Sequence, residues 1–342
     1  MVSSAEASFD VYGMRIRIAG WPEVLEAIRL DLAWFEAPFG QSNSSFGPGP
    51  ASGISVTVRN VPPQLDRLGD LRASFVTTRN VVYQLDELTI VDYFGRVVVV
   101  FDRKSSTVLI EGDELELVHE ATYLFVLSQV GEHLDAAGLL RLHALALAGA
   151  QGAVIVLLPA GGGKSTLALR ALQEADVRLL SDDTPLIDRR AHVHPFPLRL
   201  GLSAKAAAHL PPAQVRQIQR FEFPTKHVLS LEVFADRIAT DPQVIRHIVL
   251  GQRSLGRAAS LERVSRRRGV APLVRDGVIG LGVAQMAEYV LQRGWRDVTR
   301  KAGTATRRAA ICTRALAGAQ TWQLVMGRDL ERNWSALSTL LH

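Results

Sequence analysis

The chain has 342 residues, of which 47% are hydrophobic and 21% are charged. This length and apolar fraction allow a buried core in one large or two smaller domains, which excludes a globally disordered chain. The single cysteine, Cys312, excludes an internal disulfide and any cysteine cluster for zinc or iron–sulfur binding. Residues 1–20 place acidic side chains before any apolar run, so we expect no signal peptide and a cytoplasmic location.

The net charge of +5 is unevenly distributed, because residues 251–310 carry 13 Lys and Arg against 4 Asp and Glu. Such a segment can meet nucleic acid, phosphates, an acidic peptide or an anionic surface, and it can equally be a solvated helical face. Few aromatic residues lie among these arginines, so stacking on bases is not indicated and no nucleic-acid partner is expected.

The first part of the chain has short patterns typical of a small α+β domain, which we expect over residues 1–138. Turns are expected near Phe94-Gly95 and Lys104-Ser105. The predicted elements in chain order are an edge strand over 8–18, a helix over 21–35, a Gly-, Ser- and Pro-rich loop over 37–53, a strand over 53–60, antiparallel strands over 81–113 and an amphipathic helix over 114–138.

After Gly138 the pattern changes to apolar strands, and we expect a second domain over residues 139–342. No charged side chain occurs in residues 142–163, but glycines and Pro159 interrupt them, and a membrane span needs about 20 mostly apolar residues. No membrane partner is therefore expected. The predicted elements are strands over 140–148, 153–158 and 177–183, a helix over 165–176, short strands within 184–202, and mainly helical structure over 203–220 and 240–320.

A glycine-rich segment, Leu158-Pro159-Ala160-Gly161-Gly162-Gly163-Lys164-Ser165-Thr166, follows an apolar strand and precedes a predicted helix. Glycines let consecutive backbone N–H groups turn toward a phosphate, and the helix N-terminus adds positive potential. In such a loop the lysine reaches the β- and γ-phosphates and the serine hydroxyl binds Mg²⁺. Leu158 replaces the first glycine of the usual pattern, so a merely flexible loop is the alternative. The residues expected to bind the nucleotide are Ala160, Gly161, Gly162, Gly163, Lys164, Ser165 and Thr166.

Two carboxylates, Asp182 and Asp183, end the next predicted strand. One helix and one returning strand separate them from Lys164, which brings the chain back to the same edge of the sheet. A carboxylate there can bind metal or accept a proton during phosphoryl transfer. The alternative is a surface turn, because Asp-Asp before Thr-Pro is also good turn chemistry.

Two further polar residues are less clearly assigned by the sequence. His143 lies on an apolar strand, where a lone histidine is usually a satisfied core residue. Arg199 can contact a phosphate or lie on the surface with no such role.

Four segments, taken in this order, resemble the HPr kinase/phosphorylase family: Leu142-His143, GGGKSTLAL at 161–169, LLSDD at 179–183 and PFPLRL at 195–200. The similarity is nearest to HPr-kinase-related proteins of peptide-modification pathways, including lasso peptide kinases. It implies an α/β fold with a P-loop-containing core like that of HPr kinase and PEP carboxykinase, here with a small N-terminal α+β domain and a helical C-terminus. It also implies ATP and Mg²⁺ as cofactors and a serine hydroxyl as acceptor.

By the same resemblance, Asp183 is the base and Asp182 its acidic partner and a metal ligand with Ser165. His143 is then a polar residue beside the reacting phosphate. The family's downstream glycine-rich acidic signature has no clear copy, because the next acids after Asp183 are Asp188 and Glu222. Reverse phosphorylase activity is therefore not carried over from the family to this chain.

The resulting hypothesis is an ATP-dependent kinase for a serine hydroxyl of a peptide or small protein. The alternatives are a kinase for free serine or a sugar, and a nucleotide-sensing module that transfers nothing. Substrate contacts are expected from Arg199, Arg266, Arg267 and Arg268, whose planar guanidinium groups can hold two anionic oxygens at once. The family resemblance also suggests a homo-oligomer.

Overall fold

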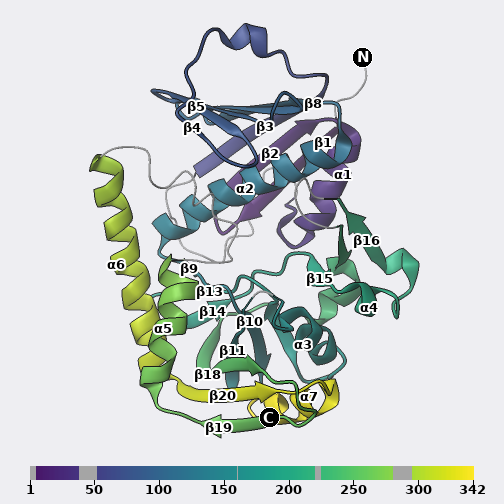
Figure 1. Ribbon diagram of the computed structural model, residues 1–342, viewed down its shortest axis with the longest axis vertical. Coiled ribbons are helices and arrows are strands. Elements are labelled where there is room, and N and C mark those ends of the chain that lie inside the picture. Colours follow the sequence, from purple (N-terminus) through teal and green to yellow (C-terminus); the bar gives the residue numbers. More distant parts are fainter. Residues whose placement is uncertain (1–4, 38–51, 160, 220–224, 280–294) are drawn as a thin grey trace. The chain divides into compact units, whose positions relative to one another are not determined.

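The computed structural model describes residues 5–37, 52–159, 161–219, 225–279 and 295–342 (Figure 1). They form two compact units: one from the described residues within 1–133 and 215–228, the other from those within 134–214, 229–285 and 293–342. The division falls inside helix α2 (Leu115–Ala137), ahead of the boundary that the sequence predicted after 138. Within the described ranges, no helix is both long and apolar enough to cross a membrane.

The first unit is built on an eight-stranded sheet in the order β1-β2-β3-β8-β7-β6-β5-β4. Strand β3 runs parallel to β2 and β8, and the other neighbours are antiparallel. The strands are β1 (Ala5–Val11), β2 (Met14–Gly20), β3 (Ser52–Asn60), β4 (Phe75–Val76), β5 (Val81–Leu85), β6 (Leu88–Asp92), β7 (Val97–Asp102) and β8 (Thr107–Gly112). The predicted antiparallel stretch over 81–113 is thereby confirmed.

The single edge strand predicted over residues 8–18 is wrong, because β1 and β2 form a hairpin there. Tyr12 and Gly13 adopt φ values of 53° and 88°, as a two-residue hairpin turn requires. The alternation of apolar and polar residues continues on both sides of this turn, so periodicity alone does not reveal it.

Helix α2 packs on this sheet, with Phe125 edge-on to Phe101 of β7 at a ring distance of 5.2 Å. It was expected to be amphipathic, but its exposed residues lie only near its two ends. Buried Asp31, at the end of α1, accepts a hydrogen bond from Arg216 Nη2 (2.5 Å) and lies 2.9 Å from His119 Nε2. The remaining elements of this unit are α1 (Pro22–Asp31), η1 (Ala33–Phe35), η2 (Leu65–Leu68), β16 (Val215–Ile218) and β17 (Lys226–Leu229).

The second unit contains a sheet in the order β12-β10-β11-β18-β14-β13-β9, with β20 also paired to β18 and β19 paired to β20. Strands β11, β18 and β20 are parallel, and β10 is antiparallel to both β11 and β12. The carboxyl ends of β12, β11, β18 and β20 therefore lie at one edge. The strands are β9 (Leu140–Arg141), β10 (Leu145–Gly149), β11 (Gly152–Leu157), β12 (Arg178–Ser181), β13 (Leu186–Ile187), β14 (His192–His194), β15 (Leu200–Leu202), β18 (Gln243–Arg253), β19 (Ser260–Arg263) and β20 (Gln320–Met326).

The mainly helical structure predicted over 240–320 is wrong for its first part and its end. Residues 243–253 form the central strand β18, and β19 and the start of β20 follow. The β-branched residues Ile245, Ile248 and Val249 favour a strand, and all three are buried. The helical segments are α3 (Lys164–Ala171), α4 (Ala204–Ala207), η3 (Pro212–Gln214), η4 (Leu231–Arg237), η5 (Arg266–Gly269), α5 (Val270–Leu273), the π-helical turn η6 (Val274–Ile279), α6 (Trp295–Gly318) and α7 (Leu330–Ser338).

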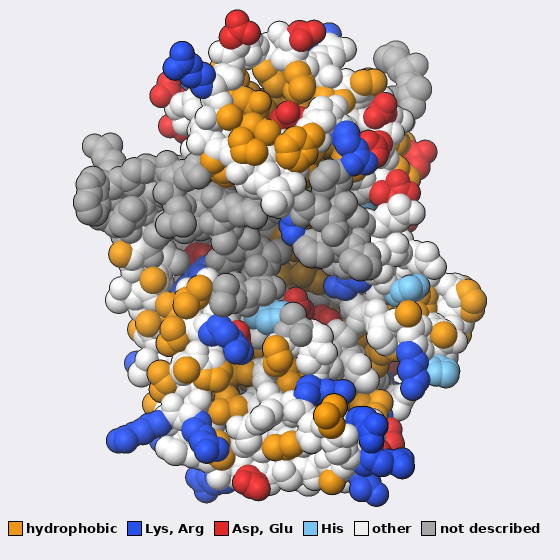
Figure 2. All heavy atoms as spheres, viewed as in Figure 1, with side chains coloured by type: hydrophobic (Ala, Val, Ile, Leu, Met, Phe, Trp, Pro, Cys, Tyr) orange, Lys and Arg blue, Asp and Glu red, His pale blue; other side chains and the backbone are white. Residues whose placement is uncertain are grey.

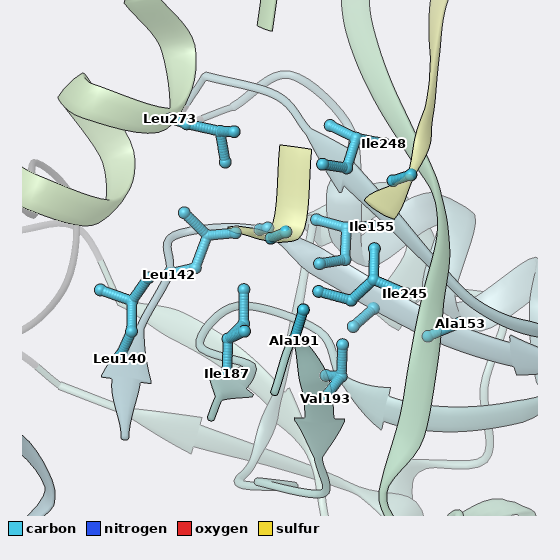
Figure 3. Close-up of a cluster of buried hydrophobic side chains, with 14 of the residues drawn as sticks. Leu140, Leu142, Ala153, Ile155, Ile187, Ala191, Val193, Ile245, Ile248 and Leu273 are labelled. Atoms are coloured by element: carbon cyan, nitrogen blue, oxygen red, sulfur yellow. The ribbon is translucent and has the colours of Figure 1, made fainter. Parts of the chain in front are cut away.

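The core of this unit lies between the sheet and its helices, and Figure 3 shows ten labelled members of it. Leu142, from the segment between β9 and β10, has no exposed surface, and neither have Ile155 of β11 and Ile248 of β18. Burial of each such side chain contributes about 1.5–3 kcal/mol. This core fixes the backbone segments whose polar residues project from the sheet edge.

Candidate functional site

The glycine loop, residues 158–163, joins the buried strand β11 to helix α3. Gly161 and Gly163 have φ values of 71° and 106°, which favour glycine. A Cβ at Gly162 would lie 2.8 Å from the carbonyl oxygen of Pro159, whose oxygen accepts a hydrogen bond from Gly162 N. The backbone conformation favours glycine at positions 161 and 163, and the lack of space for a Cβ favours it at position 162. Ala160 lies outside the described residues.

The loop ends in a helix N-terminus with unused donors. The first intrahelical bond runs from Leu167 N to Gly163 O (3.0 Å), so the N–H groups of Lys164, Ser165 and Thr166 have no partner within the helix. Such N–H groups, together with the helix dipole, favour a bound anion. Ser165 is half-buried and Thr166 is exposed on this first turn.

The side chain of Lys164 turns toward His143 and Asp183. Its Nζ atom donates to the carbonyl oxygen of Leu158 (2.9 Å) and lies 2.8 Å from Nε2 of His143. Asp183 Oδ1 is 4.0 Å from Lys164 Nζ and 3.2 Å from Nδ1 of His143. Lys164 and His143 are each 7% exposed, whereas the Asp183 side chain is 52% exposed. The three groups form a small charged cluster with one accessible carboxylate.

Backbone hydrogen bonds at a bend explain why these residues meet. The single strand predicted over 140–148 is wrong, because residues 142–144 form a bend between β9 and β10. Leu142 and Ala144 belong to the buried core, and the N–H of Ala144 donates to Asp183 O (3.1 Å), which holds the residues after β12 beside this bend. The neighbouring strand β11 then delivers the glycine loop to the same edge.

Burial determines the protonation of the cluster. It lowers the pKa of His143, against the opposing effect of the Asp183 carboxylate, so the imidazole is neutral at pH 7. Burial likewise lowers the pKa of Lys164, again opposed by Asp183. Because Lys164 donates to Nε2, the imidazole proton belongs on Nδ1, which faces Asp183 but makes no hydrogen bond within the described residues.

Asp182 is buried, and its charge acts on Lys164 by raising the pKa of that amine. No group of three or more His, Cys, Asp or Glu side chains able to hold a metal ion occurs in the described part of the chain. Ser165 and Asp182, the predicted metal ligands, are thus not part of a complete protein-made metal cage.

Two candidate residues, Asp276 and Arg253, escaped the sequence analysis. The carbonyl oxygen of Asp276, in η6, accepts a hydrogen bond from His143 N (3.2 Å). Arg253 ends β18, and its Nη1 lies 3.8 Å from the position of a Cβ on Gly163. The sequence marked Arg253 only as one residue of a basic segment. Nothing in the sequence marked Asp276 as a site residue, because it is far along the chain from the glycine loop.

The arginine cluster Arg266, Arg267 and Arg268 lies elsewhere on the unit. It follows β19, which is antiparallel to β20, and Arg266 Nε donates to Ala319 O (3.1 Å) just before β20 begins. The cluster is therefore at the amino end of β20, and the glycine loop is near its carboxyl end. Lys and Arg side chains gather where Figure 1 draws β19, β20 and α7 (Figure 2). Half-buried Arg199 directly precedes β15, and β15 contacts α3.

No protein-family profile matches this sequence, and no curated protein sequence matches it.

Proposed function

We propose that this chain is an ATP- and Mg²⁺-dependent kinase that transfers the γ-phosphate to a serine hydroxyl of a peptide or small protein. The observation that carries the proposal is the meeting of Lys164, His143 and Asp183 at the start of helix α3, which three glycines directly precede. Phosphoryl transfer requires donors that hold the phosphates and a carboxylate that can receive the acceptor proton. At this edge of the sheet, Lys164 and the backbone N–H groups would be the donors, and Asp183 would be the carboxylate.

The glycine loop and the first turn of α3 would hold the nucleotide phosphates. The backbone N–H groups of Lys164, Ser165 and Thr166 lack helical partners, and Lys164 adds a buried positive charge. The Ser165 hydroxyl and the Asp182 carboxylate would be the protein ligands of Mg²⁺. Two protein ligands suit Mg²⁺, which usually takes its other ligands from phosphates and water. The bound ion would neutralise charge on the transferred group.

Asp183 is the group best placed to accept the serine proton. Half of its side chain is exposed, so a hydroxyl can approach it, while its other neighbours are His143 and Lys164. A positioned general base contributes about 10²–10⁴-fold to the rate. His143 keeps its Nδ1 toward this carboxylate, 3.2 Å from Oδ1.

The acceptor class and a homo-oligomeric state are proposed from the family resemblance, and the cytoplasmic location is proposed from the N-terminal sequence. A serine peptide library and matched Thr and Ala peptides, incubated with γ-labelled ATP and Mg²⁺, test the acceptor class directly. We expect label on serine peptides with the wild type and not with Asp183→Asn. Label on free serine or a sugar would favour the small-molecule kinase, and ATP binding without any transfer would favour the sensing module.

A further inference from the structure

The π-helical turn η6 packs tightly against the bend, residues 142–144, that carries His143. A Cβ at Gly277 would lie 3.0 Å from Cys312 Sγ and 3.2 Å from Leu142 Cδ1, so the turn has no space to move closer. The hydrogen bond from His143 N to Asp276 O ties the same turn to the site. π-helical turns are rare and frequently occur at functional sites.

Within this turn, two neighbouring residues form an ion pair in which one partner is buried. Arg275 donates from Nε and Nη2 to the two carboxylate oxygens of Asp276, at 2.6 and 2.7 Å. The Asp276 side chain is 4% exposed and that of Arg275 is 46% exposed. Adjacent residues of a regular helix do not face each other, so this pairing is a specific arrangement. It fixes an accessible guanidinium in one orientation.

The turn that carries the pair meets the backbone of His143. The N–H groups of Leu142 and Ala144 donate to the carbonyl oxygens of Pro185 and Asp183, whereas the N–H of His143 donates to the carbonyl oxygen of Asp276. The charges of Asp276 and Arg275 both act on His143 and on Lys164. The ion pair therefore lies near the same two residues, His143 and Lys164, that Asp183 approaches.

We infer that Arg275 binds the γ-phosphate of ATP and that Asp276 is the residue that positions it; this inference rests on the proposed function. A guanidinium has five N–H donors, and Asp276 occupies two of them. The others can hold the phosphate oxygens that Lys164 and the glycine loop do not reach. The ligand class is a nucleoside triphosphate, as distinct from a diphosphate.

Calorimetric titration with Mg²⁺–ATP and with Mg²⁺–ADP tests whether Arg275 contacts the γ-phosphate, because only ATP has this group. A residue that supports nucleotide binding in general would affect both titrations equally. We expect Arg275→Gln to weaken ATP binding about tenfold, the usual size for a lost charge-assisted contact, and to change ADP binding by less than about twofold. Arg275→Lys restores part of the ATP affinity, and Asp276→Asn lowers the ATP-to-ADP affinity ratio without adding to the effect of Arg275→Gln.

Arg237→Gln is the matched control. Arg237 also pairs with its sequence neighbour, Asp236 (3.3 Å), but it donates to Glu174 O beyond the far end of α3. This variant keeps the wild-type ratio. An unchanged ratio in Arg275→Gln, or equal losses for ATP and ADP, overturns the assignment while the proposed function stands. A wild type that binds neither nucleotide overturns both.

Discussion

Lys164 Nζ and His143 Nε2 are 2.8 Å apart, and this contact joins the helix after the glycine loop to the bend between β9 and β10 beside Asp183. An ammonium can donate to Nε2 only when that nitrogen carries no proton. The lowered pKa of His143, caused first by burial, satisfies this condition at neutral pH. The positive charge of the cluster is thus concentrated on Lys164, where a phosphate would approach.

Replacement of Lys164 by Met separates ligand binding from folding. Burial disfavours the lysine charge, so we expect Lys164→Met to leave the melting temperature unchanged or slightly higher. The same variant loses measurable Mg²⁺–ATP binding by calorimetry, whereas Lys205→Met, on the exposed helix α4, binds like the wild type. Wild-type ATP affinity in Lys164→Met would remove the nucleotide assignment of the glycine loop.

Asp183→Asn tests the base independently of nucleotide binding. The amide keeps the size of the side chain but cannot accept the hydroxyl proton, so transfer of labelled phosphate falls about 10²–10⁴-fold. ATP affinity stays within about threefold of the wild type, because Asp183 Oδ1 is 4.0 Å from Lys164 Nζ and about half of the side chain is in solvent. Asp236→Asn, at a 78% exposed carboxylate, is the control. Full transfer by Asp183→Asn would favour the simple turn at Asp182-Asp183.

The sequence was sufficient to predict the helix that begins at Lys164 and the strand that ends just before Asp182 and Asp183. It did not predict the bend that carries His143, because the apolar residues on both sides of the bend resemble one continuous strand. It was insufficient for Asp276, since a short π-helical turn has no periodic pattern and long-range packing alone brings it to His143. The role of Arg253 was missed for another reason. It lies in a segment predicted to be mainly helical, although Ile245 and Ile248 of β18 are β-branched residues that favour a strand.

The position of Arg253 predicts a contrast with the arginine cluster at 266–268. Arg253 lies beside Gly163, and no hydrogen bond or ion pair of its side chain forms within the described residues. Arg253→Gln should weaken Mg²⁺–ATP binding several-fold, more strongly at low salt, because exposed charges are screened over about 8–10 Å. The combined variant Arg266→Gln, Arg267→Gln, Arg268→Gln should leave ATP affinity unchanged.

Kinase kinetics with a peptide acceptor test whether the arginine cluster at 266–268 contacts the substrate. A higher acceptor KM in the triple variant, at unchanged ATP affinity, would support the substrate contact predicted from the sequence. Weaker ATP binding in the triple variant would contradict its placement at the other end of β20.

Acid should destabilise the protein, in part through His247. Trp322 Nε1 donates to His247 Nδ1 (3.1 Å) between β20 and β18, and burial lowers the pKa of His247 below its ordinary value of 6.5. Between the folded-state pKa and 6.5 the unfolded chain binds more protons, so the free energy of unfolding falls as the pH drops through this window. Denaturant titrations at pH 5 and pH 7 measure the fall.

His247→Gln removes the titrating group while its amide oxygen can still accept from Trp322. We expect the free energy of unfolding to differ less between pH 5 and pH 7 in this variant than in the wild type. Part of the difference should persist, because burial also lowers the pKa values of His143 and His194. An unaltered difference would mean that His247 does not contribute to the linkage.

Gly327, which follows β20, has no space for a side chain. A Cβ there would lie 2.5 Å from Ala258 O and 2.6 Å from the carbonyl carbon and oxygen of Arg257, and backbone atoms cannot rotate away. Buried Asn333 also holds this residue, accepting from Gly327 N (2.9 Å) and donating to Gly327 O (3.0 Å). We expect Gly327→Ala to lower the free energy of unfolding by about 1–3 kcal/mol, the usual cost of overpacking.

The matched substitution is Gly303→Ala, in helix α6, where a Cβ meets nothing within 4 Å. There the methyl group should stabilise the protein by about 0.5–1 kcal/mol, since alanine restricts the unfolded chain and favours the helix. Denaturant midpoints of the two variants should therefore move in opposite directions. Equal midpoints would show that the loop between β18 and β19, which carries Arg257 and begins beside Arg253, yields to a side chain at Gly327.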